Sequence, residues 1–117
     1  GTPLSSSVFA TIPAEAGFPD GMTTDSAGTL FVGHWDGAQI SCWSPEGSAL
    51  PSIKIPALNI TSLAFGGEAM RTAAITTASL FPGQPDGPAL DCNGDLLAMR
   101  SAVAGLVEPV LDPDWLG

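Results

Sequence analysis

Basic residues are scarce in this chain. Of its 117 residues only three are Lys or Arg, against twelve Asp or Glu, which gives a formal net charge of −9. The three basic residues are Lys54, Arg71 and Arg100. Phosphate backbones and anionic membrane surfaces repel a protein of this charge. We therefore expect no nucleic-acid partner and no membrane partner.

Cysteines and long apolar runs are also few. Cys42 and Cys92 are the two cysteines, and without Cys-x-x-Cys spacing they indicate neither a zinc site nor a disulfide framework. We expect both to be reduced and the chain to be cytoplasmic. No apolar run approaches the length of a membrane span. No Gly-x-Ser-x-Gly motif surrounds any serine, so serine-hydrolase chemistry has no local support.

What the chain does contain is a series of short extended segments separated by turn signals. Turns are marked by Asp25 to Gly28, by Asp36-Gly37 and by Ser44 to Gly47. Between them, β-branched and aromatic residues predict strands near 21–25, 29–35, 38–44 and 50–56. Four strands joined by tight turns form an antiparallel meander of roughly 40 residues, which is the size of one β-propeller blade.

A second copy of this pattern follows about forty residues downstream. The stretch 61–67 aligns with 21–27, and 72–77 takes the place of 29–34. Further strands are expected at 60–65, 72–78 and 95–100. The sequence therefore predicts an all-β fold of propeller blades, with one blade at about 13–56 and a second blade with closing strands at about 57–117.

A long segment rich in Pro, Gly and Asp interrupts the second copy between residues 80 and 93. Because it leaves the second strand of its blade, it is expected to lie over the same face as Asp20. The alternative is a disordered surface loop, since long loops are usually either functional or mobile.

Polar residues gather where the first two predicted strands meet. Asp20 begins one strand, and His34 and Trp35 end the next. These positions are neighbours in an antiparallel pair, so we expect Asp20 and His34 on one face of the blade. His34 either edges a pocket, donates to a substrate or hydrogen-bonds a neighbouring blade. Trp35, like Trp43, is either packing between blades or part of a sugar pocket.

The motifs around these residues resemble one known family. They are Pro19-Asp20-Gly21-Met22, Asp25-x-x-Gly28, Leu30-x-Val32-x-His34-Trp35-x-Gly37, Thr61-Ser62-x-x-Phe65-Gly66-Gly67 and the ending Gly105-Leu106-Val107-Glu108-Pro109. Together they are similar to the senescence marker protein, gluconolactonase and luciferin-regenerating enzyme family, over nearly the whole chain. The resemblance implies a six-bladed propeller that binds one divalent cation in its central channel and hydrolyses sugar lactones.

The resemblance also implies roles for individual residues. Asp20 matches a metal ligand that is also a candidate general base. The pocket assignment of His34 and Trp35 comes instead from their position at the end of the strand, where we expect them to border the substrate pocket. The cation is expected to be Ca²⁺, with Zn²⁺, Mg²⁺ and Mn²⁺ as alternatives. In the family, the remaining Glu and Asn ligands and the substrate-binding Arg and Asn lie in an N-terminal part that is absent here. Without the family pattern, Asp20 reads as a turn residue of Pro-Asp-Gly.

The chemistry of a lactone explains why a carboxylate and a cation belong together. The carbonyl oxygen becomes negative as water attacks, so a divalent cation can polarise it while a carboxylate takes a proton from the water. Asp20 suits either purpose. A hard cation takes six to eight oxygens, however, so one carboxylate cannot make the site alone.

The length of the chain limits this interpretation. Roughly forty residues a blade gives two blades, whereas closed propellers have four to eight. The chain begins at Gly1 without a Met, and 5–12 is expected to be the outer strand of a preceding blade. Either a homo-oligomer or a companion chain is expected to complete the propeller. Two functions stay open: a lactone hydrolase that is incomplete alone, and a non-catalytic propeller module retained for binding or structure.

Overall fold

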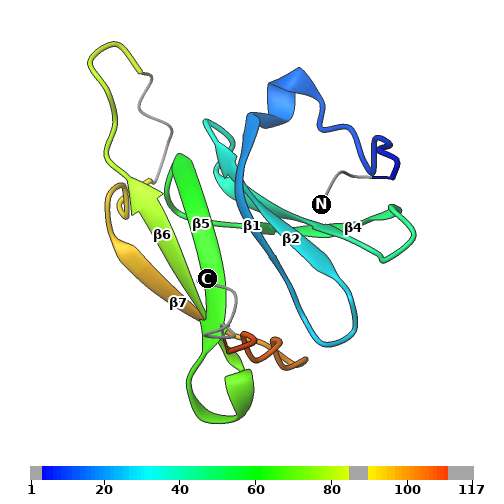
Figure 1. The fold of residues 1–117 in the computed structure, drawn as a ribbon. Coiled ribbons are helices and arrows are strands. Elements are labelled where there is room, and N and C mark those ends of the chain that lie inside the picture. The colour runs from blue at the N-terminus through cyan, green and yellow to red at the C-terminus, as the bar shows by residue number, and fades with distance from the viewer. Residues whose placement is uncertain (1–3, 85–89, 111–117) are drawn as a thin grey trace, which may run out of the picture.

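The computed structural model describes residues 4–84 and 90–110, which form two antiparallel β-sheets (Figure 1). The first sheet has the order β1-β2-β3-β4, with β1 at Phe18–Thr24, β2 at Leu30–Trp35, β3 at Gln39–Trp43 and β4 at Ala49–Lys54. The second has the order β5-β6-β7, with β5 at Asn59–Gly66, β6 at Thr72–Ala78 and β7 at Leu96–Arg100. The expected all-β fold is confirmed.

Helix is confined to two short turns within the described residues. They are the 3₁₀ helices η1 (Ala14–Ala16) and η2 (Glu68–Met70). Across this part of the chain, neither helix has the length or the apolar character to cross a bilayer. No closed ring of sheets is seen among the described residues, and the division of the chain at about residue 56 into two blades stays a prediction.

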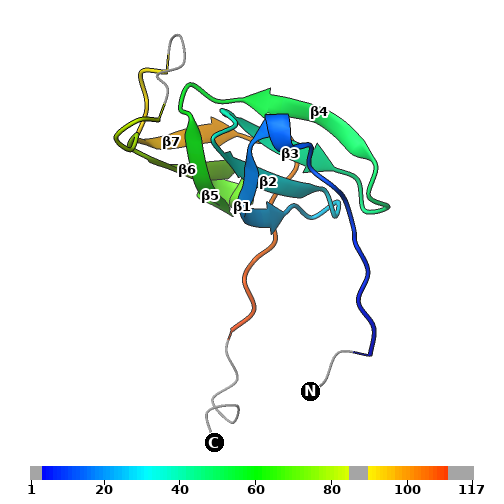
Figure 2. The ribbon, with the colours of Figure 1, turned by 90° about the horizontal axis from the view of Figure 1, so that it is seen from above.

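The two sheets lie beside each other and share one apolar core (Figure 2). Strand β5 contacts both β1 and β2 of the first sheet. Phe31 of β2 meets Phe65 of β5 edge to face, with ring centroids 5.6 Å apart and planes at 73°. The other buried members of this core are Ile40, Cys42, Ile55, Ala57, Ile60, Leu63 and Ile75. This packing fixes the first sheet relative to the start of the second.

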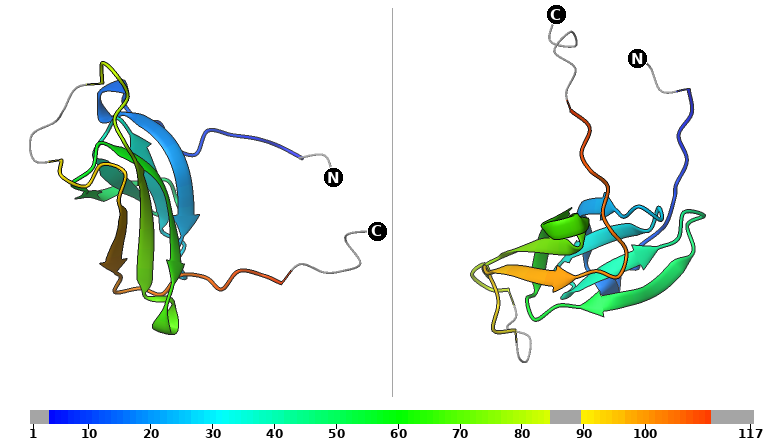
Figure 3. Two further views of the ribbon diagram at one scale, coloured as in Figure 1. Left: turned by 90° about the vertical axis from the view of Figure 1, so that its left-hand side faces the viewer. Right: turned by 90° about the horizontal axis from the view of Figure 1, so that it is seen from below.

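The N-terminal segment departs from the sequence-based expectation. Residues 5–12 were expected to form an outer strand, but they form no strand with the described residues. A strand needs a neighbour to receive its backbone hydrogen bonds, and the described chain places none beside this segment. The described parts of both terminal segments leave the sheets in the same direction (Figures 2 and 3).

Each sheet contains a β-bulge near the start of its first strand. In β1 the register with β2 shifts between Pro19 and Met22. In β5 the register with β6 shifts between Ile60 and Ser62. The sequence repeat aligns Gly21 with Thr61, so the two bulges occupy equivalent positions. The repeat is therefore also a repeat of backbone geometry, and Ile60 stands where the first copy has Asp20.

The turn between β1 and β2 is organised by the buried carboxylate of Asp25. Its Oδ1 accepts hydrogen bonds from the backbone N–H groups of Ala27 and Thr29, each at 2.9 Å. The backbone of Asp25 also forms a bridge to Gly105, and Ser26 N–H donates to the carbonyl of Ala104. This turn therefore anchors the returning C-terminal segment at the end of the sheets opposite to Asp20.

Replacing Asp25 with Ala is expected to lower the free energy of unfolding by about 1–3 kcal/mol, because two partly buried N–H groups lose their acceptor. The rate of any reaction at Asp20, measured per folded molecule, should stay unchanged. Equilibrium urea unfolding measures the first quantity. Asp25→Asn is the matched control because it keeps Oδ1, and a larger loss for Asn than for Ala would contradict this role.

Candidate functional site

Asp20 lies in the β1 bulge with an exposed side chain. The Cα partner of His34 across the strand pair is Pro19 rather than Asp20. The expectation that Asp20 and His34 share a face as direct neighbours is therefore corrected by one position. The physical reason is the bulge, because an extra residue breaks the strict alternation of side chains between the two faces.

Gly21 allows the β1 bulge to lie against the second sheet. A Cβ at this position would overlap the side chain of Ser62 and the carbonyl of Thr61, both in β5. Only glycine permits this approach, so the Asp-Gly pair has a steric basis. The backbone that carries Asp20 is thereby held against β5, where the second copy of the repeat begins.

His34 is buried, and both of its ring nitrogens are occupied. A carbonyl oxygen only accepts, so Nδ1 carries the hydrogen and donates to Ala16 O at 2.7 Å. The Ser41 hydroxyl donates to Nε2 at 2.7 Å and itself accepts from Trp43 Nε1 at 2.9 Å. The imidazole has no nitrogen left for a substrate or a metal ion, which favours the structural alternative for His34.

The hydrogen bond from His34 Nδ1 to Ala16 O fixes the backbone corner at residues 16–17, which leads into β1. Gly17 has φ +90°, and any Cβ there would overlap the carbonyl of Trp35. A Cβ at Gly37 would in turn overlap the carbonyl of Ala16. The corner at residues 16–17 is thus wedged against the turn between β2 and β3. Through its bond to Ala16, His34 therefore fixes the backbone that leads into β1 and Asp20.

Trp35 stacks on a residue of the segment that follows β6. Its ring centroid lies 5.1 Å from that of Phe81, with the planes at 31°. Phe81 belongs to the segment that leaves β6, so the described part of the predicted long loop does lie over the sheet end that carries Asp20 (Figure 1). The contact with Phe81 agrees with a packing role for Trp35. The ring is also half exposed, so a place in a sugar pocket stays open as the alternative.

Asn59 is a site residue that the sequence analysis missed. It is fully buried, and its side-chain amide bonds Gln84 twice, at 2.9 and 2.7 Å. Its Oδ1 also accepts from the backbone N–H of Asp36 at 3.1 Å. The only signal in the sequence was a polar residue at the start of an apolar strand. Asn59 joins the β2–β3 turn to the loop after β6.

The described residues do not complete a cation site. Across residues 4–84 and 90–110, no three His, Cys, Asp or Glu side chains come close enough together to hold a metal ion. Asp20 offers one carboxylate, while Ca²⁺ takes six to eight oxygens. Further ligands would have to come from outside the described residues.

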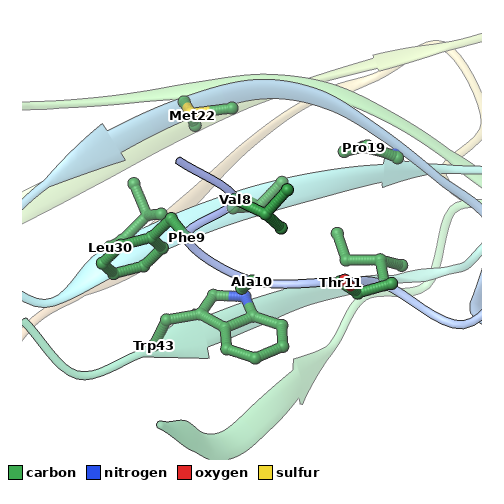
Figure 4. Close-up of a pocket in the computed structure, with 10 residues that line it drawn as sticks. Val8, Phe9, Ala10, Thr11, Pro19, Met22, Leu30 and Trp43 are labelled. Atoms are coloured by element: carbon green, nitrogen blue, oxygen red, sulfur yellow. The ribbon is translucent and has the colours of Figure 1, made fainter. Parts of the chain in front are cut away.

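A cavity of about 450 Å³ lies elsewhere, between residues 8–12 and the outward face of the first sheet (Figure 4). The sheet side of its lining is Pro19, Met22, Leu30, Val32 and Trp43. None of the residues that line it is titratable. This cavity is therefore an apolar space beneath residues 8–12 and offers no catalytic group.

Cys42 is buried in the core, and neither it nor Cys92 forms a disulfide. Burial raises the pKa of the Cys42 thiol, and the nearby negative charge of Asp25 raises it further. Because the folded-state pKa lies above the unfolded one, folding favours the neutral thiol. The contribution of the neutral Cys42 thiol to the free energy of unfolding is fully present below about pH 8.5, the usual pKa of a free thiol. It is lost as the pH rises through the raised pKa of the folded state.

We expect iodoacetamide to modify Cys42 about tenfold or more slowly than Cys92 at neutral pH, because the thiolate is the reactive form and Cys92 is only half buried. Mass spectrometry of a time course measures both rates. In denaturant the two rates should converge. Equal rates in the folded protein would show that Cys42 is accessible.

The sequence of this chain matches one family of proteins with known names. Residues 1–79 match the model of the SMP-30/gluconolactonase/LRE-like region. The chain belongs to this family. The match contains the Pro-Asp-Gly-Met bulge, the wedged β2–β3 turn and all of β5 and β6. The family resemblance expected from the sequence is therefore confirmed.

Two curated members of the family are named as lactonases. The chain is 37% identical over 81 residues to pentonolactonase XacC of Haloferax volcanii, covering 69% of this chain and 27% of the relative. It is 35% identical over 94 residues to 6-deoxy-6-sulfogluconolactonase of Pseudomonas putida, covering 80% and 32%. The chain thus spans less than a third of the length of these relatives.

Solved structures show the same arrangement of strands. A luciferin-regenerating enzyme superposes with a TM-score of 0.70 at 30% identity, over 80% of this chain and 31% of that one. Regucalcin from Agrobacterium tumefaciens, described as a calcium-binding protein, superposes with a TM-score of 0.77 at 22% identity, over 92% and 37%. The second likeness establishes the fold alone.

Proposed function

We propose that this chain contributes part of the active site of a metal-dependent sugar-lactone hydrolase. The observation that carries the proposal is the exposed carboxylate of Asp20 in a bulge held against β5, in a chain that belongs to a family with named sugar lactonases. Asp20 has the exposure that an acid–base group needs, while His34 does not.

In this proposal the Asp20 carboxylate accepts a proton from the water that attacks the lactone carbonyl. The proton then passes to the ring oxygen as the C–O bond breaks and the hydroxy acid forms. His34 holds the backbone before Asp20, and Gly21 holds the backbone after it. A bound divalent cation would supply polarisation of the carbonyl oxygen, with Asp20 as one of its oxygen ligands. Calcium suits an all-oxygen site best, with zinc, magnesium or manganese as alternatives.

The remaining ligands are proposed to come from additional blades, in a six-bladed propeller of which this chain forms the C-terminal part. Met22 and Leu96 are exposed on the described sheets, and the face around Met22, Leu30 and Trp43 borders the apolar cavity. Covering such a face stabilises an assembly by about 25 cal/mol per Å² of apolar surface. Either further copies of the chain or a companion polypeptide would provide the cover.

Association and activity should therefore appear together. We expect a dilution series to show loss of gluconolactone hydrolysis at the concentration where sedimentation shows dissociation, and added Ca²⁺ to raise the activity of the assembled particle only. Mass spectrometry of the native particle identifies any companion chain. A fully active, strictly monomeric 117-residue species would contradict the shared site.

A further inference from the structure

A series of side-chain hydrogen bonds crosses the first sheet and ends at the corner before β1. Trp43 Nε1 donates to Ser41 Oγ at 2.9 Å, and the Ser41 hydroxyl donates to His34 Nε2 at 2.7 Å. His34 Nδ1 then donates to Ala16 O at 2.7 Å. An indole N–H only donates and a carbonyl oxygen only accepts, so the donors in the series all point toward Ala16. We call these bonds the relay.

The relay decides which ring nitrogen of His34 carries the hydrogen. Free histidine in water favours hydrogen on Nε2, whereas a bond to Ala16 O requires hydrogen on Nδ1. Trp43 donates to the Ser41 oxygen, which directs the hydroxyl hydrogen to Nε2 and keeps that nitrogen an acceptor. Ser41 and Trp43 therefore determine whether His34 can hold Ala16.

The backbone between Ala16 and Asp20 receives little support from strand pairing. Pro19, the cross-strand partner of His34, has no backbone N–H to donate, and the bulge follows it directly. A second side-chain bond to Ala16 O, from Gln39 Nε2, is longer, at 3.4 Å. The bond from His34 is therefore the stronger anchor of the backbone that leads to Asp20.

Trp43, at the start of the relay, is held by apolar packing. Its ring lines the cavity beneath residues 8–12, and so does Leu30, its Cα partner on β2 (Figure 4). This contact fixes the direction of the indole N–H toward Ser41. The relay thus begins at an apolar contact surface and ends at the backbone before Asp20.

We propose that Ser41 and Trp43 are positioning residues for Asp20: they keep His34 in the tautomer with hydrogen on Nδ1, and thereby fix the backbone that aims the carboxylate. They supply no group to the reaction. The inference rests on the proposed lactone hydrolysis and adds a connection to it. The face on which further blades are proposed to pack carries Trp43, so packing on that face affects the orientation of Asp20.

The kinetic test compares two serines in the particle that the chain forms in solution. Ser41→Ala removes the hydroxyl and should lower kcat for D-glucono-δ-lactone about tenfold, with KM within about twofold, because a small misplacement of a reacting group is costly. Ser41→Thr keeps the hydroxyl and should restore kcat. Ser52→Ala, at an exposed serine of β4, is the matched control and should leave kcat unchanged. Trp43→Phe keeps an aromatic ring without the N–H and should lower kcat by a smaller factor than Ser41→Ala.

Nitrogen-15 NMR tests the relay without reference to activity. The chain has one histidine, so [¹⁵N]histidine labelling of this chain gives a single pair of ring signals. In mildly alkaline buffer, we expect wild type, Ser41→Thr and Ser52→Ala to carry the hydrogen on Nδ1. Ser41→Ala and Trp43→Phe should populate the other tautomer. The backbone amide signal of Asp20 should shift in the same two variants.

The two readouts separate this inference from the proposed function. If wild type hydrolyses no lactone but the tautomer and the Asp20 signal change as expected, the proposed function fails and the positioning role stands. If Ser41→Ala has the kcat of Ser52→Ala, or changes the tautomer without moving the Asp20 signal, the positioning role is overturned. Should Ser41→Ala not fold, Trp43→Phe decides by the same measurements.

Discussion

Replacing Asp20 with Ala should lower kcat/KM for a sugar lactone by about 10²–10⁴-fold, the usual contribution of a positioned acid–base group. The carboxylate is exposed in a bulge, so its removal leaves the shared core of the sheets intact. The second copy of the repeat offers no substitute, because Ile60 occupies the equivalent position. Steady-state hydrolysis of gluconolactone at saturating Ca²⁺ measures the effect.

Two further variants make this result specific. Asp20→Asn keeps the size of the side chain but removes the charge, so it should lose activity and Ca²⁺ affinity together. Glu46→Gln removes an exposed carboxylate from the turn between β3 and β4 and should change neither. Wild-type activity in Asp20→Ala at saturating Ca²⁺ would rule out Asp20 as ligand and as base.

Replacing Ile60 with Ala should lower the free energy of unfolding by about 2–5 kcal/mol, as for other fully buried large-to-small changes. Ile60 is 0% exposed and belongs to the core that the two sheets share. Its Cγ2 lies 3.1 Å from the position that a Cβ on Gly33 would take, so it fills the space that this glycine leaves on β2. Equilibrium urea unfolding gives the value.

The loss of stability should depend on how much of the Ile60 side chain is removed from the core. Ile60→Val removes one methylene and should lower the stability by about 0.5–1.5 kcal/mol. Leu106→Ala, at an exposed position, should stay within about 0.5 kcal/mol of wild type. If Ile60→Ala were as mild as Leu106→Ala, the two sheets would not share a core in solution.

The strands were predictable because their signals are local. Asp25 and Gly28 mark one turn, the run Leu30-Phe31-Val32 marks a strand, and the structure places β2 within a residue of the expected bounds. Residues 5–12 show the limit of this reasoning. Their extended pattern was recognised, but a strand also requires a neighbour, and strand pairing is a property of the whole fold.

The site was predictable only as far as its residues are close in sequence or carried by a motif. Asp20 was found through Pro-Asp-Gly-Met, and Trp35 through its position at the end of a strand. The amide pair of Asn59 and Gln84 joins residues 25 positions apart. The contact of Trp35 with Phe81 joins the end of β2 to the segment after β6. No local pattern encodes such contacts, because they depend on how the sheets pack.

The direction in which the Asp20 side chain points depends on the number of residues in the β1 bulge. The bulge places two residues of β1, Asp20 and Gly21, between the pairs Pro19–His34 and Met22–Val32, where β2 has one residue. Deleting one of the two would restore strict alternation while Pro19 and Met22 keep their partners and their face. Met22 and the strand after it would keep their packing. A one-residue deletion at this point would therefore change the direction of the side chain at position 20 while sparing the core, which a point substitution does not do.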